Sequence, residues 1–308
     1  MRRLLLAVAV AVGLALLVAG CGGSDEGSGS GTGRAGTPPP LRLGTKNFPE
    51  QFLLGQLYKQ ALEARGFAVE LKEDIGSTEI VHQALTDGAL DMYPEYVGVL
   101  LSEVADVRSR PSSPRAAYRE AQAFERRRGF TLLDMTPFSD SNALAVKPGY
   151  ARRNGVRSLQ DLKSIPGTVR IGAPPEFATR FEGLVGLGDL YGVHNARATP
   201  MAIGNQYAAL DSGKVDAAAV FTTDGQLAGR RYVLLGDPRG LFGTQHVAPI
   251  ISRKALQARG PSLRAAIDAV SRRLTAAAMR RMNAAVVLRH RSPRAVAADF
   301  LRAQGLVG

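Results

Sequence analysis

Two short segments place side chains that could hold a small charged ligand directly after predicted strands. They are residues 45–51 (TKNFPEQ) and residues 91–98 (DMYPEYVG). The ammonium of Lys46 can pair with a carboxylate, and the ring of Tyr96 can turn its electron-rich face to a cation. Each residue alone has a common alternative, because isolated lysines are usually solvated and isolated tyrosines usually pack against apolar neighbours. Together the two segments favour capture of a small zwitterion over catalysis.

The surrounding sequence alternates between strand-like and helix-like patterns. Apolar residues recur at helical spacing in 54–62 and 80–85. Further helices are expected at 114–128, after Pro175, and behind the capping residues Ser262 and Ser292. Strands are expected at 41–45, 67–71, 90–93, 131–133, 143–146, 168–171, 215–221, 233–235 and 247–251. The alternation predicts an α/β protein with mostly parallel sheets.

The order of these elements predicts two lobes between which the chain crosses twice. Lobe 1 is expected at 41–140 plus 246–308, and lobe 2 at 141–245. Two lobes joined by two crossings can open and close on a ligand like a clamp.

The candidate ligand-binding residues fall where such a clamp would close. Ligands of open α/β sheets bind beyond the carboxyl ends of the strands. Lys46, Tyr96 and Phe221 follow such ends, while Asn142 and Gln245 lie at the two expected crossings. We therefore expect these residues to meet in the cleft.

The N-terminus reads as an export signal followed by a tether. Residues 1–20 join two arginines to an apolar run that is short for a membrane span. Residues 18–21 (VAGC) resemble the lipobox of bacterial lipoproteins, which predicts cleavage before Cys21 and lipidation of its thiol. Residues 21–40 are rich in Gly, Ser, Thr and Pro, a composition typical of flexible tethers. The expected location is the outer face of the cell membrane.

Two other functional classes stay open at this point. The net charge of +12 allows a basic envelope protein that binds polyanions, although the arginines are dispersed and no nucleic-acid-binding motif accompanies them. The second class is a lipoprotein hydrolase. The four histidines His82, His194, His246 and His290 show neither metal-ligand spacing nor a nucleophile elbow. We expect no enzyme activity, no metal, no cofactor and no nucleic-acid partner.

Five motifs resemble one family of receptors. They are residues 44–51 (GTKNFPEQ), 91–96 (DMYPEY), 142–146 (NALAV), 175–180 (PEFATR) and 220–225 (VFTTDG). In combination they are similar to the substrate-binding proteins of ABC importers for the osmoprotectants glycine betaine, choline and carnitine. The resemblance implies a two-lobed type II periplasmic-binding-protein fold and a monomer that delivers its ligand to a membrane permease. A separate ATPase subunit would supply the energy, since this chain has no phosphate-binding loop.

The resemblance also assigns roles to single residues. Members of this family hold a trimethylammonium group in a box of tyrosines and neutralise the carboxylate with a lysine, an arginine and a threonine. By position in the motifs, Lys46 and Arg180 correspond to the carboxylate clamp, and Tyr96 corresponds to one wall of the box. Further residues that we expect beside the site or in control of its specificity are Gln51, Val99, Asp140, Thr222 and His246.

Four positions depart from the family pattern. Asn142, Phe221 and Gln245 stand where tyrosines are usual, and Val99 replaces a threonine that would donate to the carboxylate. Each cation–π contact contributes about 0.5–2 kcal/mol, so a box with fewer tyrosine rings should bind a plain quaternary ammonium group more weakly. The amides of Asn142 and Gln245 could instead favour a ligand with a polar head. Ergothioneine, a ring-bearing betaine, and polar amino-acid-like solutes are the alternatives to glycine betaine.

Overall fold

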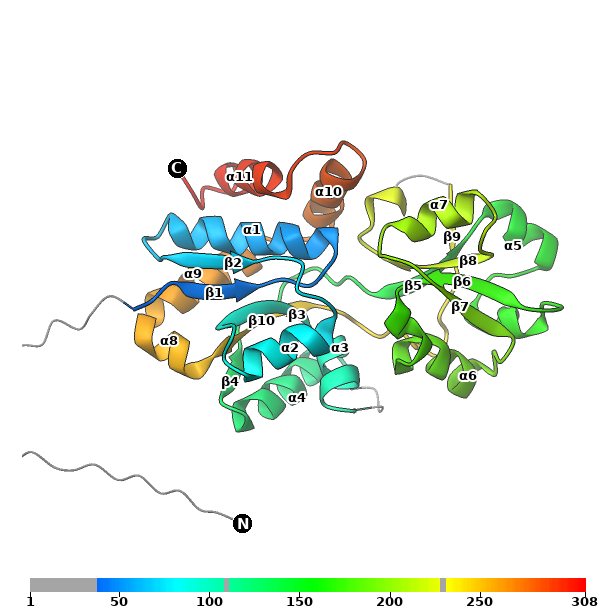
Figure 1. The fold of residues 1–308 in the computed structure, drawn as a ribbon, viewed down its shortest axis with the longest axis horizontal. Helices are drawn as coiled ribbons and strands as arrows, with labels where there is room; N and C mark the ends of the chain where they lie inside the picture. The colour runs from blue at the N-terminus through cyan, green and yellow to red at the C-terminus, as the bar shows by residue number, and fades with distance from the viewer. Residues whose placement is uncertain (1–37, 108–110, 228–230) are drawn as a thin grey trace, which may run out of the picture. The chain divides into compact units, whose positions relative to one another are not determined.

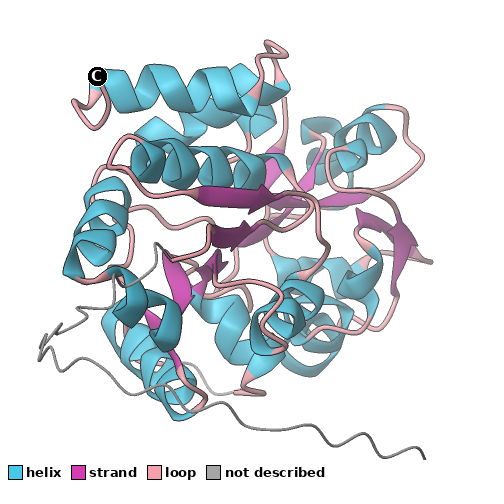
Figure 2. Cartoon of the chain, turned by 60° about the vertical axis from the view of Figure 1, so that its left-hand side comes forward, coloured by secondary structure: helices cyan, strands magenta, loops and turns pink. Residues whose placement is uncertain are grey.

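The computed structural model describes residues 38–107, 111–227 and 231–308. The predicted signal peptide, Cys21 and most of the expected tether lie outside these residues. In the part that is described, the strands form two separate five-stranded sheets with helices against them (Figure 1; Figure 2).

The first sheet carries the segments that the sequence singled out. Its strand order is β2-β1-β3-β10-β4. β1 pairs in parallel with β2 and β3, whereas β10 runs antiparallel between β3 and β4. The strands are β1 (Leu41–Gly44), β2 (Val69–Lys72), β3 (Met92–Tyr96), β4 (Phe130–Leu132) and β10 (Val247–Ser252).

The second sheet has the same plan and the order β7-β6-β8-β5-β9. β6 pairs in parallel with β7 and β8, and β5 runs antiparallel to β8 and β9. The strands are β5 (Asn142–Val146), β6 (Val169–Ala173), β7 (Ala196–Pro200), β8 (Ala217–Phe221) and β9 (Val233–Leu234).

Helices connect the strands and close the C-terminal part. The α-helices are α1 (Pro49–Glu63), α2 (Thr78–Thr86), α3 (Val97–Val99), α4 (Pro114–Arg127), α5 (Pro148–Asn154), α6 (Gly186–Tyr191), α7 (Asn205–Asp211), α8 (Arg253–Arg259), α9 (Pro261–Ser271), α10 (Ala276–Val287) and α11 (Pro293–Ala303). Short 3₁₀ or π segments are η1 (Leu100–Val104), η2 (Leu159–Ser164), η3 (Pro175–Ala178), η4 (Phe181–Val185) and η5 (Gly225–Leu227).

The expectation of mostly parallel sheets is confirmed, since four strands of each sheet run in one direction and a single strand runs against them, which makes both sheets mixed. The antiparallel strands are β5 and β10, the strands that the chain enters directly after a crossing. A chain that arrives at the carboxyl end of a parallel sheet must run back along it, which reverses the strand. The short strand β7 was not predicted, because its sequence ARATP is neither apolar nor β-branched throughout.

Two local predictions also needed correction. Ser292 does cap α11, and its Oγ accepts a hydrogen bond from the Ala295 N–H at 3.2 Å. Ser262 is not a cap, because α9 starts one residue earlier at Pro261, behind Gly260 with φ +75°. The helix expected after Pro175 is only one 3₁₀ turn, η3.

The two crossing segments pair with each other. Ser139 and His246 form an antiparallel bridge. The Asp140 N–H donates to the Gln245 carbonyl at 2.9 Å, and the Gln245 N–H donates to Ser139 Oγ at 2.8 Å. Both predicted lobe boundaries fall within this paired segment.

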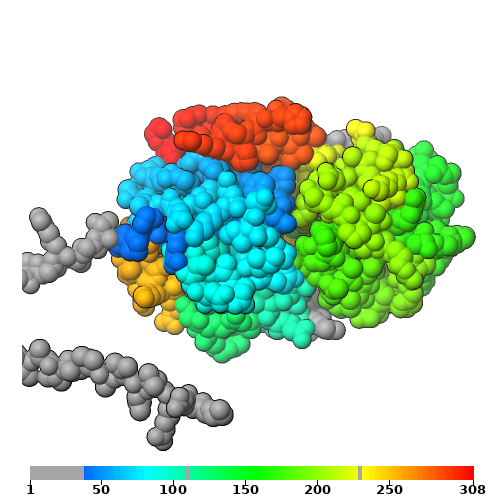
Figure 3. All heavy atoms as spheres, viewed as in Figure 1, coloured from blue at the N-terminus to red at the C-terminus, as the bar shows by residue number. Residues whose placement is uncertain are grey.

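Each sheet has its own apolar core. In the first lobe, the C-terminal helices pack over α1, as the red and blue-to-cyan surfaces in Figure 3 show. The buried hydroxyl of Tyr58 on α1 bonds Ser271 Oγ on α9 at 2.9 Å. Across residues 38–107, 111–227 and 231–308, the helices are all too short or too polar to span a bilayer.

Candidate ligand-binding site

A pocket of about 800 Å³, solvent at its mouth included, lies between the two sheets. Segments that follow β1 and β3 line it from the first lobe, and β5, β8 and the η3–η4 region line it from the second. All six residues predicted to bind ligand line this pocket: Lys46, Tyr96, Asn142, Arg180, Phe221 and Gln245.

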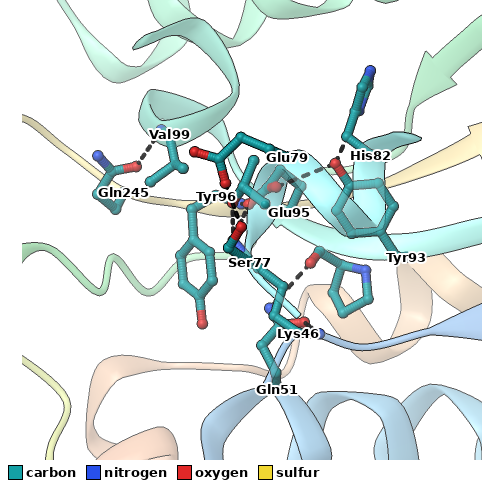
Figure 4. A network of polar contacts seen from close by, with 12 residues as sticks. Lys46, Gln51, Ser77, Glu79, His82, Tyr93, Glu95, Tyr96, Val99 and Gln245 are labelled. Atoms are coloured by element: carbon teal, nitrogen blue, oxygen red, sulfur yellow. Dashed lines mark hydrogen bonds and ion pairs between the residues drawn. The ribbon is translucent and has the colours of Figure 1, made fainter. Parts of the chain in front are cut away.

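Lys46 is buried in a polar network rather than solvated. Only 4% of its surface is exposed, and its ammonium forms an ion pair with the carboxylate of Glu95 (Figure 4). The ammonium also donates to Thr78 Oγ1 at 2.9 Å and lies 4.5 Å from the centroid of the Tyr96 ring. Burial lowers the pKa of Lys46, and Glu95 opposes that shift. The lysine therefore reaches the pocket with its charge already paired.

Three aromatic rings form one continuous surface in the pocket. Phe48 stacks on Phe221 with a centroid distance of 5.2 Å and lies 6.0 Å from Tyr96. The Tyr96 hydroxyl donates to Glu50 at 2.8 Å, which fixes the plane of the ring. Phe48 was not among the predicted site residues, although its place two residues after Lys46 is a signal that could have found it. The surface joins the two lobes, because Phe48 follows β1 and Phe221 ends β8.

Arg180 lies at a junction of three carboxylates. Its guanidinium bonds Glu79 on α2 of the first lobe at 2.7 and 3.1 Å, and lies 3.7 Å from Glu103 and 3.8 Å from Glu176. Burial opposes ionisation of Glu79, but the hydrogen bond and charge of Arg180 outweigh it and lower the pKa of Glu79 to about 2. Arg180 thus links the lobes at the pocket.

Asn142 and Gln245 converge on a carboxylate that sequence reasoning missed. Asn142 Nδ2 donates to Glu182 at 2.7 Å, and Gln245 Nε2 donates to the same carboxylate at 2.8 and 3.0 Å. Gln245 Oε1 accepts from the Val99 N–H at 3.0 Å. Glu182 reaches this place because the backbone breaks at Gly183, where a Cβ would lie 2.0 Å from the Phe177 carbonyl oxygen.

The other predicted residues divide into pocket wall and support. Val99 and Asp140 line the pocket. Gln51 and Thr222 support it from behind: Gln51 Oε1 accepts from the Lys46 N–H at 3.2 Å, and Thr222 Oγ1 accepts from the Ser141 N–H at 3.0 Å. His246 turns away and bonds the Thr136 carbonyl at 2.9 Å, so it does not contribute to the wall.

The Lys46 network continues into the first lobe. The Tyr93 hydroxyl donates to Glu95 at 3.2 Å and bonds His82 Nδ1 at 3.0 Å, as Figure 4 shows. Behind it, His82 Nε2 lies 3.6 Å from a carboxylate oxygen of Glu125, which is fully buried. Burial lowers the pKa of His82 to about 4 and raises that of Glu125 to about 7. A carboxyl with a raised pKa stabilises the fold below its unfolded pKa, and that contribution is lost as the pH rises through about 7.

We therefore expect Glu125→Gln to stabilise the protein at pH 8 and to leave its stability nearly unchanged at pH 5. The amide keeps the shape of the side chain and removes the buried negative charge. At about 2–4 °C per kcal/mol for a chain of this size, the melting temperature at pH 8 should rise by a few degrees. Thermal unfolding of both proteins across this pH range is the measurement. A lower melting temperature for the variant at pH 8 would show that the carboxylate is stabilising there.

Comparisons with known proteins agree with this geometry. The family described as the substrate binding domain of ABC-type glycine betaine transport systems matches residues 39–303. A glycine-betaine-binding protein from Pseudomonas aeruginosa is 33% identical over 278 residues, which cover 87% of this chain and 88% of that protein. An ergothioneine transport permease and binding protein from Helicobacter pylori is 26% identical over 269 residues, 87% of this chain and 48% of that protein.

A solved structure supports the fold. The crystal structure of a glycine betaine/carnitine/choline ABC transporter protein has a TM-score of 0.68 and 23% identity, and the match covers 86% of this chain and 99% of that chain. This confirms the α/β, two-lobed periplasmic-binding-protein fold that the sequence predicted. The chain belongs to the family of substrate-binding domains of ABC-type glycine betaine transport systems, a family of transport receptors outside the cytoplasm.

Proposed function

We propose that this protein captures a small quaternary ammonium compound or zwitterion by closing its two lobes and delivers it intact to an ABC permease. The observation that carries this proposal is the aromatic surface of Phe48, Tyr96 and Phe221, which both lobes build beside Lys46 and Arg180. Aromatic faces attract a quaternary cation, and fixed cations can receive a carboxylate. Glycine betaine and choline are the first candidate ligands.

The charges that line the pocket favour binding of the ligand's cationic group over binding of its carboxylate. Besides Lys46 and Arg180, the wall includes Glu103, Asp140, Glu176 and Glu182. Both wall cations are already paired with carboxylates of the protein. A ligand carboxylate must therefore compete with these protein carboxylates for Lys46 and Arg180, whereas the cationic group of a ligand is attracted by the acidic side chains of the wall.

A second candidate ligand class has a polar ring or an amino-acid-like head, with ergothioneine as the example. The amides of Asn142 and Gln245 stand where the family resemblance places tyrosines, and both are fixed by Glu182. This end of the pocket offers oriented polar atoms instead of aromatic faces, which suits a head that forms hydrogen bonds.

Calorimetric titration with glycine betaine, choline, carnitine and ergothioneine tests both candidates. We expect one-to-one binding of at least one of them, and a preference for ergothioneine if the amide end selects the ligand. Tight binding of plain glycine betaine over ergothioneine would contradict that preference. A failure of all four would contradict the proposed function.

We also propose that the protein is anchored by a lipid on Cys21 and that it does not catalyse a reaction. Lipidation at Cys21 would keep the receptor near its permease, and metabolic labelling of the thiol with a fatty acid tests it. The receptor is proposed to act as a monomer and to return its ligand unchanged. Turnover of a bound ester or amide would favour a hydrolase, and salt-sensitive binding of a polyanion would favour the basic envelope protein.

A further inference from the structure

Three carboxyl groups lie together behind the aromatic surface of the pocket. A second cavity of about 400 Å³, open solvent included, shares Phe48 and Phe221 with the first and is lined by Glu50, Asp140 and Asp224. These carboxyls come from α1 of the first lobe, from a crossing segment and from the loop after β8 of the second lobe. The cluster is therefore built from both lobes and from the segment that joins them.

The hydrogen bonds to Glu50 come from uncharged groups. Glu50 accepts from the Tyr96 hydroxyl at 2.8 Å, from Thr223 Oγ1 at 2.5 Å and from Asn283 Nδ2 at 2.6 Å. Thr223 belongs to the second lobe, so its bond to Glu50 joins the two lobes directly. Glu50 is only 4% exposed.

Asp140 and Asp224 are held in the same way. Asp140 Oδ1 accepts from the Thr223 N–H at 2.9 Å, and Asp224 Oδ2 accepts from the Phe221 N–H at 3.0 Å and the Tyr207 hydroxyl at 2.8 Å. Asp140 Oδ2 is buried and receives no donor from the residues that the structure describes. Thr223 bonds both carboxyls, Glu50 through its hydroxyl and Asp140 through its N–H, and the side chain of Asp140 interacts with that of Glu50. An interaction between two carboxyls is favourable when one of them carries a proton.

Among the residues that the structure describes, the partners of these carboxyls are uncharged groups. β3 contributes Tyr96 and α7 contributes Tyr207, both uncharged, and α10 contributes the amide of Asn283. The Lys46 ammonium lies over the Tyr96 ring, 4.5 Å from its centroid, and is paired with Glu95. Within the described ranges, these acidic side chains are also not arranged to hold a metal ion. Neighbouring carboxyls that are buried to this extent resist being ionised together.

We propose that lobe closure takes up one proton, which Glu50 and Asp140 share, so that ligand affinity rises as the pH falls. This inference rests on the proposed function, because ligand binding drives the closure. In an open form water solvates the two carboxyls, and each ionises near its ordinary pKa of about 4. In the closed form burial raises the pKa of both Glu50 and Asp140, and it raises that of Asp224 to about 6.

The direction in which ligand affinity changes with pH follows from these raised pKa values. A group that binds its proton more tightly in the closed form favours that form at low pH. The advantage is lost as the pH rises through the raised pKa. Affinity should therefore fall between pH 5 and pH 8, by up to about tenfold per pH unit for one linked proton.

Calorimetry of glycine betaine and choline binding in two buffers of different ionisation enthalpy measures the proton directly. We expect uptake of close to one proton per ligand near pH 7, where Asp224, with a pKa of about 6, stays mostly ionised and contributes little. Glu50→Gln and Asp140→Asn should each abolish the uptake at pH 7 and flatten the affinity profile above that pH, because an amide donates the hydrogen bond without a titrating proton. Asp134→Asn, at an exposed carboxylate of the first lobe, is the matched control and should retain the uptake.

The outcomes separate this proposal from the proposed function. Ligand binding with no proton uptake, or uptake retained in both cluster variants, would overturn the shared proton and leave the receptor function intact. If none of the four candidate ligands binds at any pH, the proposed function fails, and the pH dependence of the melting temperature then tests the shared proton. The gain in melting temperature from pH 8 to pH 5 should be larger for the natural protein than for Glu50→Gln. Equal gains would overturn the proposal.

Discussion

Replacing Gly225 with alanine is expected to lower ligand affinity while each lobe stays folded. Gly225 begins η5 in the second lobe and lies against α10 of the first. A Cβ at this position would lie 2.6 Å from the Cα and 2.9 Å from the backbone nitrogen of Ala284. Since backbone atoms cannot move aside as a side chain would, the lobes must separate slightly. Overpacking of this kind costs about 1–3 kcal/mol, which corresponds to about fivefold to more than a hundredfold in affinity.

Gly236→Ala is the matched control for this substitution. Gly236 also lies in a loop of the second lobe, but its nearest heavy atoms are 3.6 Å from an added Cβ. Titration calorimetry gives the affinity, and far-ultraviolet circular dichroism shows whether the lobes remain folded. Equal affinities for the two variants would mean that the ligand does not require the close contact of η5 with α10.

Arg180→Ala is expected to weaken binding by about tenfold or more, because a charge-assisted contact that closes the pocket is lost. The substitution removes the bond to Glu79 across the lobes and leaves Glu103 and Glu176 beside it without their shared cation. A second expectation separates two roles of the guanidinium. If it also holds a ligand carboxylate, glycine betaine should lose more affinity than choline, which has no carboxylate.

Arg272→Ala provides the comparison for Arg180→Ala. Arg272 forms an exposed ion pair with Asp134, and such pairs contribute little. Its affinity should match that of the natural protein for both ligands. An unchanged affinity in Arg180→Ala would remove this arginine from the site, and equal losses for both ligands would restrict its role to closing the lobes.

The sequence predicted which residues would meet because strand ends are readable from periodicity. Lys46, Tyr96 and Phe221 each follow a predicted strand, and all three line one pocket. What the sequence could not supply was their pairing. The ion pair of Lys46 with Glu95 depends on the register of β1 against β3, and this register cannot be read from the sequence of either strand.

Glu182 shows a second limit of sequence reasoning. Its segment reads as an ordinary continuation of the helix expected after Pro175. The backbone instead breaks at Glu182 and Gly183, which aims the carboxylate at Asn142 and Gln245. Such a break is set by the close approach of Gly183 to the Phe177 carbonyl, a tertiary contact that periodicity does not reveal. The reversal of β5 and β10 was not predicted for a related reason, since strand direction depends on where each crossing enters.

The most direct test of the proposed receptor function is a crystal structure of the protein with the quaternary ammonium compound that binds most tightly. We expect a single ligand between the two sheets, with its cation against the rings of Tyr96 and Phe221 and any carboxylate toward Lys46 or Arg180. Ligand density on an outer surface, or a pocket that stays empty at saturating ligand, would contradict it.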